Sequence, residues 1–157
     1  MAEQDETVAT LATRTALRVL AERYAGGVDR RDVARFLSAF HADARLRVYN
    51  PSDADEPVNE MRGHEQLGVI PEMIKVYPKT YHVLGQSTYE ILGDTATGEV
   101  YCMAHHLTSD RHGGTNYVMY IRYTDEYRAG TDGEWRIADR RVLIDWTEAR
   151  VANPPGR

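Results

Sequence analysis

The sequence contains few of the residues on which several classes of protein depend. Cys102 is its only cysteine, so the chain can form neither an internal disulfide nor a thiolate metal cluster, as is usual in a reducing cytoplasm. No apolar run reaches the roughly 18 residues of a membrane-spanning helix, and the acidic start Met1–Glu6 lacks the pattern of a secretion signal. A net charge of −5 is the wrong sign for a nucleic-acid-binding surface. We therefore expect a cytoplasmic protein that binds neither membranes nor nucleic acids.

Length and composition predict one folded domain. A chain of 157 residues, with 42% hydrophobic and 27% charged residues, is long enough for one core and leaves little room for a second. We expect the domain to span residues 1–157, with an ordered core over about 7–147 and a linker-like tail over 148–157.

Helical periodicity characterises the first half of the chain. Apolar residues at three- and four-residue spacing predict a helix over Thr7–Tyr24, which Gly26–Gly27 would end. A second helix is expected to run to about residue 40, with Asp29 at its N-cap. Residues 63–77 predict a third helix, which Pro71 would bend or restart.

Long alternating segments dominate the second half. The expected strands span Arg45–Tyr49, Thr80–Ile91, Thr95–Leu107, Asn116–Tyr127 and Glu134–Trp146. Turn-forming residues separate the last four, which favours an antiparallel meander. Three helices followed by such a meander predict an α+β fold, a cone-shaped α+β barrel whose helices pack on a curved, mostly antiparallel sheet. We expect a conical pocket between the two layers.

Asp29 and His82 are the leading candidates for chemistry. A carboxylate that holds a histidine in one tautomer makes it a better base at neutral pH. In the alternative interpretation, Asp29 only caps its helix and His82 is a half-buried strand residue. Sequence spacing cannot decide whether the two side chains meet.

A second histidine is expected near the pocket. His105 and His106 are adjacent in a strand and point to opposite faces, so one of them must face inward. We favour His105, because it shares a stripe with Tyr101 and Met103 that could line the pocket. The alternative is a strand end that opens into a polar loop.

Arginine and tyrosine side chains could complete the site. Arg140 and Arg141 also point in opposite directions, so one could bind an anionic group in the cavity while the other forms an exposed ion pair. Tyr24 lies one helical turn before Asp29 and could donate a hydrogen bond to a substrate oxygen. Tyr49 is a weaker candidate of the same kind, and both tyrosines could simply pack at the edge of the core.

Motifs for other chemistries are missing. The chain has no His-Glu-x-x-His, no cysteine pair, no Gly-x-Gly-x-x-Gly, no phosphate-binding loop and no Gly-x-Ser-x-Gly. We therefore expect neither a metal nor another cofactor.

Four short segments of the sequence resemble those of a known protein superfamily. They are Gly27-Val-Asp-Arg-Arg31, Thr80-Tyr-His82, Tyr123-Thr-Asp-Glu-Tyr127 and Gly133-Glu-Trp-Arg-Ile137. Together with the order of elements over roughly residues 10–147, they resemble the SnoaL-like branch of the nuclear transport factor 2-like superfamily. That branch includes hexachlorocyclohexane dehydrochlorinase. Scytalone dehydratase and bile-acid 7α-dehydratase share the same order of secondary-structure elements. The superfamily also contains isomerases, cyclases and non-catalytic members, so the resemblance is more specific for fold than for function.

The resemblance implies roles for particular residues. Asp29 and His82 match the catalytic dyad, and Tyr24 occupies the place of the dehydratases' substrate-facing tyrosine, where the dehydrochlorinase has a lysine. Dechlorination is therefore disfavoured. His105 falls near the second acid–base position of the dehydratases and Tyr49 near their other tyrosine. The arginine of the last strand corresponds to Arg140 or Arg141.

These observations predict a cofactor-independent lyase of the dehydratase type. His82, held by Asp29, would remove a proton from a small hydrophobic substrate that carries a carbonyl or hydroxyl group. The alternatives are an isomerase or polyketide cyclase with the same base, or a non-catalytic binding or assembly domain. In each case we expect a homo-oligomer, a dimer or a trimer, because an exposed apolar sheet face favours a partner subunit.

Overall fold

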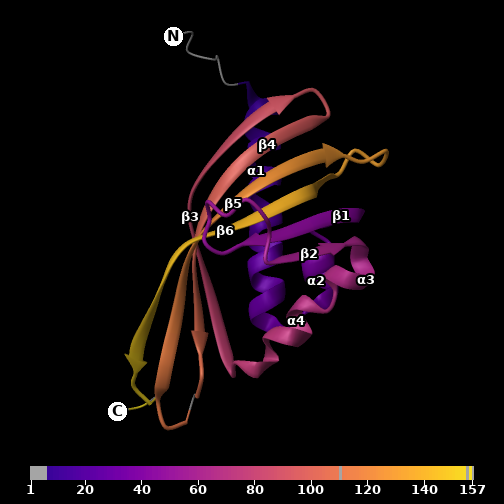
Figure 1. The fold of residues 1–157 in the computed structure, drawn as a ribbon. Helices are drawn as coiled ribbons and strands as arrows, with labels where there is room; N and C mark the ends of the chain where they lie inside the picture. Colours follow the sequence, from indigo (N-terminus) through magenta and orange to yellow (C-terminus); the bar gives the residue numbers. More distant parts are fainter. Residues whose placement is uncertain (1–6, 110, 155, 157) are drawn as a thin grey trace.

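The computed structural model describes residues 7–109, 111–154 and 156. Its helical elements are α1 (Val8–Arg30), α2 (Val33–Leu37), α3 (Gly63–Leu67), α4 (Ile70–Met73) and the 3₁₀ helix η1 (Ile74–Val76). Its strands are β1 (Phe40–Tyr49), β2 (Asn59–Arg62), β3 (Lys79–Leu92), β4 (Thr95–Leu107), β5 (Gly114–Ala129) and β6 (Trp135–Ala152). Figure 1 shows their arrangement.

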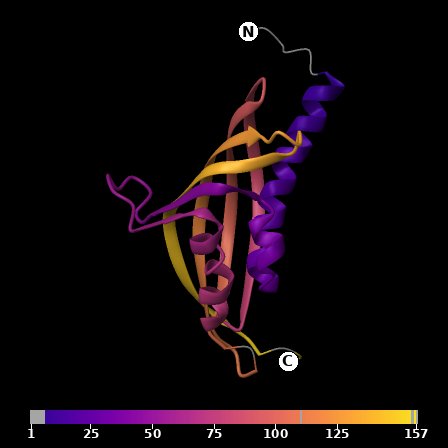
Figure 2. The same ribbon diagram turned by 90° about the vertical axis from the view of Figure 1, so that its right-hand side faces the viewer.

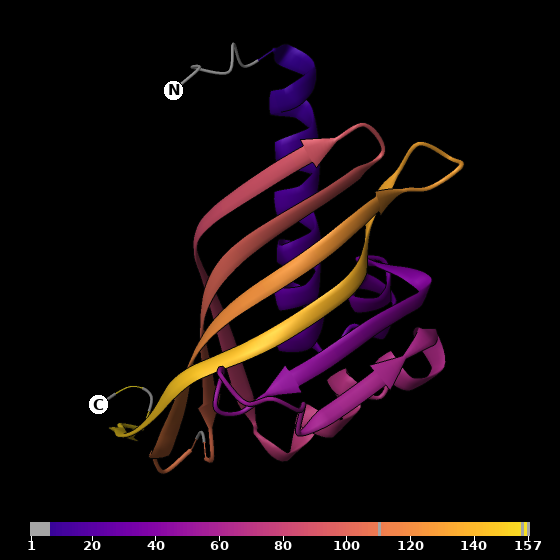
Figure 3. The same cartoon turned by 45° about the horizontal axis from the view of Figure 1, so that its top comes forward.

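The strands form one curved sheet in the order β2-β1-β6-β5-β4-β3. All neighbours are antiparallel except β1 and β6, which run parallel. Helix α1 lies against one face of the sheet, and the twist of β3 to β6 carries the strands across it (Figures 2 and 3). The fold is therefore the predicted α+β architecture, with a mostly antiparallel sheet. We call the face that packs on the helices the inner face and the opposite face the outer face.

The first helix is longer than its sequence predicts. Helix α1 continues through Gly26–Gly27 and ends at Arg30, while Arg31 adopts a left-handed conformation with φ of 57°. Asp32, not Asp29, is the N-cap of α2, since its side chain accepts from the backbone N–H of Arg35. The prediction that Asp29 caps a second helix is therefore wrong. Asp29 lies in the last turn of α1 with its side chain free for other contacts.

Close packing explains why two glycines do not end α1. A Cβ atom on Gly27 would lie 2.6 Å from the backbone N and Cα of Phe36, so the missing side chain lets α2 fold back directly onto α1. A glycine inside a helix costs roughly 1 kcal/mol, and here it permits a close approach that any side chain would prevent.

The remaining elements differ from the prediction mainly at their ends. Strand β1 begins at Phe40 instead of residue 45, and β2 is an additional strand between the predicted strand Arg45–Tyr49 and the predicted helix over residues 63–77. The third helix is broken into α3, α4 and η1, with Pro71 in the first turn of α4. Strand β6 continues to Ala152, so the paired structure includes part of the expected tail. Among the described residues, no helix is both long enough and apolar enough to span a membrane.

The core lies between α1, α2 and the inner face. It is built from apolar residues of all these elements, among them Leu17, Phe36, Phe40, Val100, Cys102 and Ile137. Tyr24, Tyr123 and Tyr127 are also buried there. The inner face additionally carries buried ionisable groups, because Asp125, His106 and Arg140 are all buried.

Candidate functional site

The end of α1 meets the start of β3 at Asp29. One carboxylate oxygen, Oδ1, lies 2.7 Å from Nδ1 of His82 and accepts a hydrogen bond from the Thr80 hydroxyl at 2.9 Å. The other oxygen, Oδ2, accepts from the backbone N–H of His82 at 2.9 Å. Three donors from one strand therefore fix the position of this carboxylate.

These contacts determine the ionisation of Asp29. Burial raises the pKa of the carboxyl, but the bonds from the His82 ring and backbone and from Thr80 outweigh it, so the pKa is lowered. An ionised carboxylate can only accept, so Nδ1 of neutral His82 must carry the ring proton. The other ring nitrogen, Nε2, then has the free lone pair that a base requires.

The histidine is more enclosed than its partner. The side chain of His82 is 6% exposed and that of Asp29 is 21% exposed. The Tyr24 ring meets the His82 ring edge-on, with centroids 6.3 Å apart. Burial raises the pKa of Tyr24 to about 12, so this phenol stays neutral and can donate a hydrogen bond at neutral pH.

The second inward histidine is His106, not His105. His106 is buried, and its ring lies 6.1 Å from that of His82 and 5.0 Å from that of Tyr77. Burial, followed by the nearby His82, lowers the pKa of His106, so its neutral form is favoured. Its Nδ1 lies 3.4 Å from the carbonyl oxygen of Tyr117 and donates to it.

The stripe of Tyr101, Met103 and His105 lies on the outer face, away from the helices. Tyr101 and Met103 line a hollow of about 230 Å³ there with Trp146, and His105 is hydrogen-bonded to Asn116. Tyr101 and Met103 therefore do not lie beside His82, whereas His105 is part of the lining of a depression that also includes Asp29. His106 alternates with Ala104 and Cys102, whose small side chains leave room for the helices.

The two arginines of β6 have separate environments. Arg140 is fully buried and bonds Asp125 through Nε at 2.8 Å and Nη2 at 2.6 Å. Its guanidinium is also stacked between the rings of Tyr24 and Tyr123, at 4.4 and 4.3 Å. Arg140 is therefore the inward arginine, but Asp125 already neutralises its charge.

Arg141 is exposed on the outer face. Its guanidinium lies 4.8 Å from the ring of Tyr49, whose hydroxyl also accepts a hydrogen bond from Arg47. Tyr49 therefore faces away from His82, and the prediction that it contacts a substrate there is wrong.

Three residues of the site have no role in the sequence-based prediction. Arg31, Thr80 and Asp125 all occur in the segments that carry the resemblance, but no function is predicted for any of them. The alternation Tyr123-x-Asp125-x-Tyr127 was the available signal for Asp125, because it places the carboxylate on the same face as two large rings. No comparable local pattern points to Arg31.

A depression of about 560 Å³ reaches the carboxylate of Asp29. It follows the free edge of the sheet at β3, and its lining includes Asp29, Pro78, Thr80, Tyr81, His105 and Leu107. Most of the surface that β3 and β4 contribute to this depression is apolar, which suits a small hydrophobic molecule.

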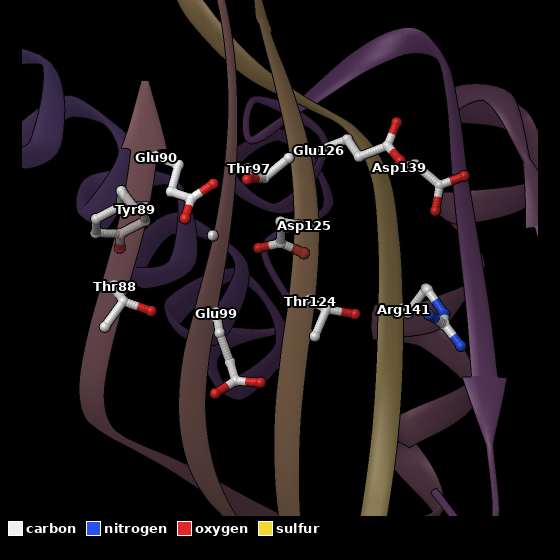
Figure 4. A pocket seen from close by; sticks show the side chains of 11 residues that line it. Thr88, Tyr89, Glu90, Thr97, Glu99, Thr124, Asp125, Glu126, Asp139 and Arg141 are labelled. Carbon is white, nitrogen blue, oxygen red and sulfur yellow. The ribbon is translucent and has the colours of Figure 1, made fainter. Parts of the chain in front are cut away.

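A second depression lies on the outer face. Its volume is about 560 Å³. Figure 4 shows its lining, which includes Glu90, Glu99, Glu126, Asp139 and Arg141. Across the described ranges, no three His, Cys, Asp or Glu side chains come together in a way that could hold a metal ion.

The fold and this site can now be compared with those of known proteins. The family model for the SnoaL-like domain matches residues 9–141. The chain belongs to the SnoaL-like family, within the nuclear transport factor 2-like superfamily. No curated protein matches the chain.

Solved structures share the fold at low sequence identity. A candidate scytalone dehydratase from Novosphingobium aromaticivorans is 20% identical, with a TM-score of 0.72 and coverage of 94% of this chain and 95% of that one. Hexachlorocyclohexane dehydrochlorinase type 3 from Novosphingobium barchaimii is 18% identical, with a TM-score of 0.74 and coverage of 89% and 91%. A protein of unknown function with a cystatin-like fold, from Nostoc punctiforme, is 21% identical, with a TM-score of 0.67 and coverage of 88% and 93%.

Proposed function

We propose that this protein is a lyase of the dehydratase type, with His82 as its base. The observation that carries the proposal is the 2.7 Å hydrogen bond between His82 Nδ1 and Asp29, which leaves Nε2 to accept a proton. Membership of the SnoaL-like family and the similarity to dehydratase and dehydrochlorinase folds support an enzyme of lyase, isomerase or cyclase kind. The proposed substrate is a small hydrophobic molecule with a hydroxyl group on the carbon β to a carbonyl.

The reaction is a two-step elimination. Nε2 of His82 takes the proton from the α-carbon, and the electron pair of that C–H bond moves toward the carbonyl to form an enolate. When the enolate collapses, the double bond forms between the α- and β-carbons and the C–O bond at the β-carbon breaks. The departing hydroxide takes the proton from Nε2 and leaves as water, which returns His82 to its neutral form. Asp29 stabilises the imidazolium between the two steps.

Neighbouring groups have supporting roles in this proposal. The neutral phenol of Tyr24 is the donor for the enolate oxygen, and such donors act most strongly in an enclosed site of low dielectric constant. His106 is the histidine beside the His82 ring, while His105 is part of the lining of the depression at Asp29. Because His82 is almost fully enclosed, a substrate reaches it only when side chains between the ring and the depression at Asp29 move.

Deuterium exchange tests the proton abstraction without knowledge of the natural substrate. A panel of hydrophobic β-hydroxy ketones is incubated with the protein in D₂O and followed by mass spectrometry. The expected results are enzyme-dependent incorporation of deuterium at the α-carbon in D₂O and, in a parallel reaction in H₂O, a product 18 mass units lighter because water has left. Exchange in wild type that persists undiminished in His82→Ala would overturn the assignment of the base.

The same experiment separates the enzymatic alternatives. An isomerase or cyclase with the same base would exchange the α-proton and give a product of unchanged mass in H₂O.

In a non-catalytic domain we would expect Asp29 only to cap a helix and its carboxylate to lie beyond hydrogen-bonding distance of His82. Instead, Asp32 caps α2, and Asp29 Oδ1 lies 2.7 Å from His82 Nδ1. A panel that shows neither exchange nor turnover would nevertheless favour this alternative.

We also propose that the chain self-associates through the outer face. Val83, Met103, Tyr120 and Trp146 form a row across β3 to β6, in which each residue is paired in register with the next. Tyr120 and Trp146 are stacked at 4.2 Å. Tyr81 and Tyr101 flank the row, and we call these six residues the apolar patch.

The exposed area and the charges around it favour a second copy of this chain as the occupant. Tyr81 is 70%, Trp146 55% and Tyr101 37% exposed. At about 200 Å² per aromatic side chain, these three rings present roughly 300 Å², a substantial part of the about 800 Å² per partner in a standard interface. The rim carries both signs of charge, in the pairs Arg122–Asp145 and Arg150–Glu148, so two copies can face each other without net repulsion. The acidic depression of Figure 4 would instead repel its own copy.

A further inference from the structure

We propose that Arg31 and Thr80 are positioning residues that fix the proton arrangement of the Asp29–His82 pair. The proposal concerns the proposed catalytic site and rests on His82 as its base. Neither residue needs to contact the substrate. Their effect would be to keep the ring proton of His82 on Nδ1 and the lone pair on Nε2.

Arg31 occupies the junction between the two elements that carry the pair. It follows α1 in a left-handed conformation, with φ of 57°. Its Nη1 donates to the carbonyl of Val28 at 2.8 Å and to the Thr80 hydroxyl at 2.7 Å, and its Nη2 donates to the carbonyl of Tyr77 at 2.8 Å. One planar cation therefore ties the last turn of α1, which carries Asp29, to the start of β3, which carries His82.

The chemistry of these donors gives the hydrogen bonds a single direction. A guanidinium can only donate, so the Thr80 oxygen must accept from Arg31. The only proton of that hydroxyl is then free for Asp29 Oδ1, which lies 2.9 Å away. The same Oδ1 faces His82 Nδ1 at 2.7 Å. Because an ionised carboxylate has no proton to give, the imidazole must donate from Nδ1.

Without Arg31 the direction of the hydrogen bond from Thr80 to Asp29 would no longer be fixed. The Thr80 hydroxyl could rotate away and offer Asp29 no proton. The carboxylate would lose one of the donors that hold its plane, and the His82 ring could turn or adopt the other tautomer. When the ring proton of His82 is on Nε2, that nitrogen cannot accept a proton from the substrate. Activity would therefore decrease as the share of the Nε2–H tautomer increases.

Three variants and two controls separate positioning from a general structural role. Thr80→Val removes the hydroxyl at nearly constant volume, whereas Thr80→Ser keeps it. Arg31→Met removes the donors of the guanidinium. Thr88→Val on the exposed side of β3 is the matched control for the threonine, and Arg30→Met, at the exposed neighbouring position, is the control for the arginine.

The primary measurement is the tautomer of His82, by ¹⁵N–¹H correlation NMR on protein with labelled histidine, with the signal assigned through His82→Gln. We expect the Nδ1–H form to predominate in wild type, Thr80→Ser, Thr88→Val and Arg30→Met. In Thr80→Val and Arg31→Met we expect a measurable share of the Nε2–H form. The rate of α-proton exchange should fall by about 10-fold to 10²-fold in these two variants, as for other small misplacements of a catalytic group, with KM unchanged.

The outcomes distinguish this proposal from the function on which it rests. If Thr80→Val has the same tautomer and exchange rate as Thr88→Val, the positioning role is wrong, even though His82 remains the base. If His82→Ala keeps its activity, the catalytic proposal is wrong, while the NMR spectra still test the proton arrangement. If Arg31→Met fails to fold, the pair Thr80→Val and Thr80→Ser decides the question.

Discussion

Each face of the sheet carries some side chains that are uncommon there in a small globular domain. Between the inner face and the helices lie ionisable groups in pairs: Asp29 of α1 with His82, and Asp125 with Arg140. The outer face exposes rings, including those of Tyr81 and Trp146. Buried ion pairs cost desolvation energy, and exposed aromatic patches favour association. This contrast agrees with the proposed chemistry at the inner face and the proposed self-association through the outer face.

The two inner pairs differ in the partner of the carboxylate. Asp125 is bound to a permanent cation, and both side chains are 0% exposed. Asp29 is bound to a group that can gain and lose a proton, and it remains in contact with solvent. Only the second pair suits proton transfer, so the first should determine stability and the second activity.

The largest expected effect is on activity. His82→Ala and Asp29→Asn should each reduce α-proton exchange by about 10²-fold to 10⁴-fold, since general acid–base groups contribute this much, while circular dichroism shows a folded protein. His112→Ala, at an exposed position outside the lining of the depression at Asp29, is the matched control and should retain its exchange rate. An equal loss in His112→Ala and His82→Ala would contradict the assignment of His82 as the base.

The next largest effect is on stability. Asp125→Asn should reduce the free energy of unfolding by about 3–5 kcal/mol, because it leaves the Arg140 cation buried without a counter-charge. Urea denaturation measures this change. Asp145→Asn breaks the more exposed pair with Arg122 on the outer face and should cost no more than about 1 kcal/mol.

A comparable stability loss in these two carboxylate variants would contradict the contrast between the faces. In the double variant Asp125→Asn with Arg140→Met, part of the loss should be recovered, because the uncompensated charge is gone.

The third effect is on association. Trp146→Glu places a charge in the apolar patch and should weaken self-association by at least about 30-fold, the equivalent of a 2 kcal/mol hot spot. Sedimentation velocity should show an oligomeric wild type and a smaller species for the variant. Leu92→Glu replaces another exposed apolar residue of β3, outside the patch, and should leave the assembly unchanged.

Two results would overturn the proposed interface. One is a monomeric wild type at concentrations up to about 100 μM, which would be too weak for an interface of standard size. The other is a Trp146→Glu variant that sediments as the wild type does.

The smallest effect is on the pH dependence of stability. The pKa of His106 is lower in the folded protein than its ordinary value of 6.5, so the unfolded chain binds a proton first as the pH falls. The stability associated with a neutral His106 is therefore complete above pH 6.5 and is lost as the pH falls through the folded pKa. Thermal denaturation between pH 7.5 and 5 should show a shallower decline in His106→Gln than in wild type. His112→Gln, at an exposed position, should follow wild type, and identical slopes in all three proteins would contradict the assignment.

The sequence was a good guide to the strands and a poor one to the faces of β4. Thr95–Leu107 was predicted with the observed ends, because turn residues flank it on both sides. Its two stripes are both apolar, with Val100, Cys102 and Ala104 on one and Tyr101 and Met103 on the other. Alternation identifies two stripes but does not say which one is covered by helices. The choice of His105 over His106 failed for that reason.

The helical part was predicted less well, because long-range contacts decide its boundaries. Gly26–Gly27 ordinarily favours a helix end, and only the approach of Phe36 explains why the helix continues. Asp29 and His82 could be proposed from sequence as a pair, since both residue types are suited to acid–base chemistry. Their distance depends on how α1 crosses β3, a property of the whole fold.

Gly27 is a position at which substitution should be poorly tolerated, although it contributes no side chain to the proposed chemistry. Its nearest non-local neighbours are backbone atoms of Phe36, which cannot turn aside as a flexible side chain would. Even an added methyl group would therefore push α2 and α1 apart, two residues before Asp29 and four before Arg31. A mutational survey of this protein should find position 27 as intolerant as position 82, although glycine contributes no functional group. The tolerance to substitution in this fold is thus set by spacing as much as by chemistry.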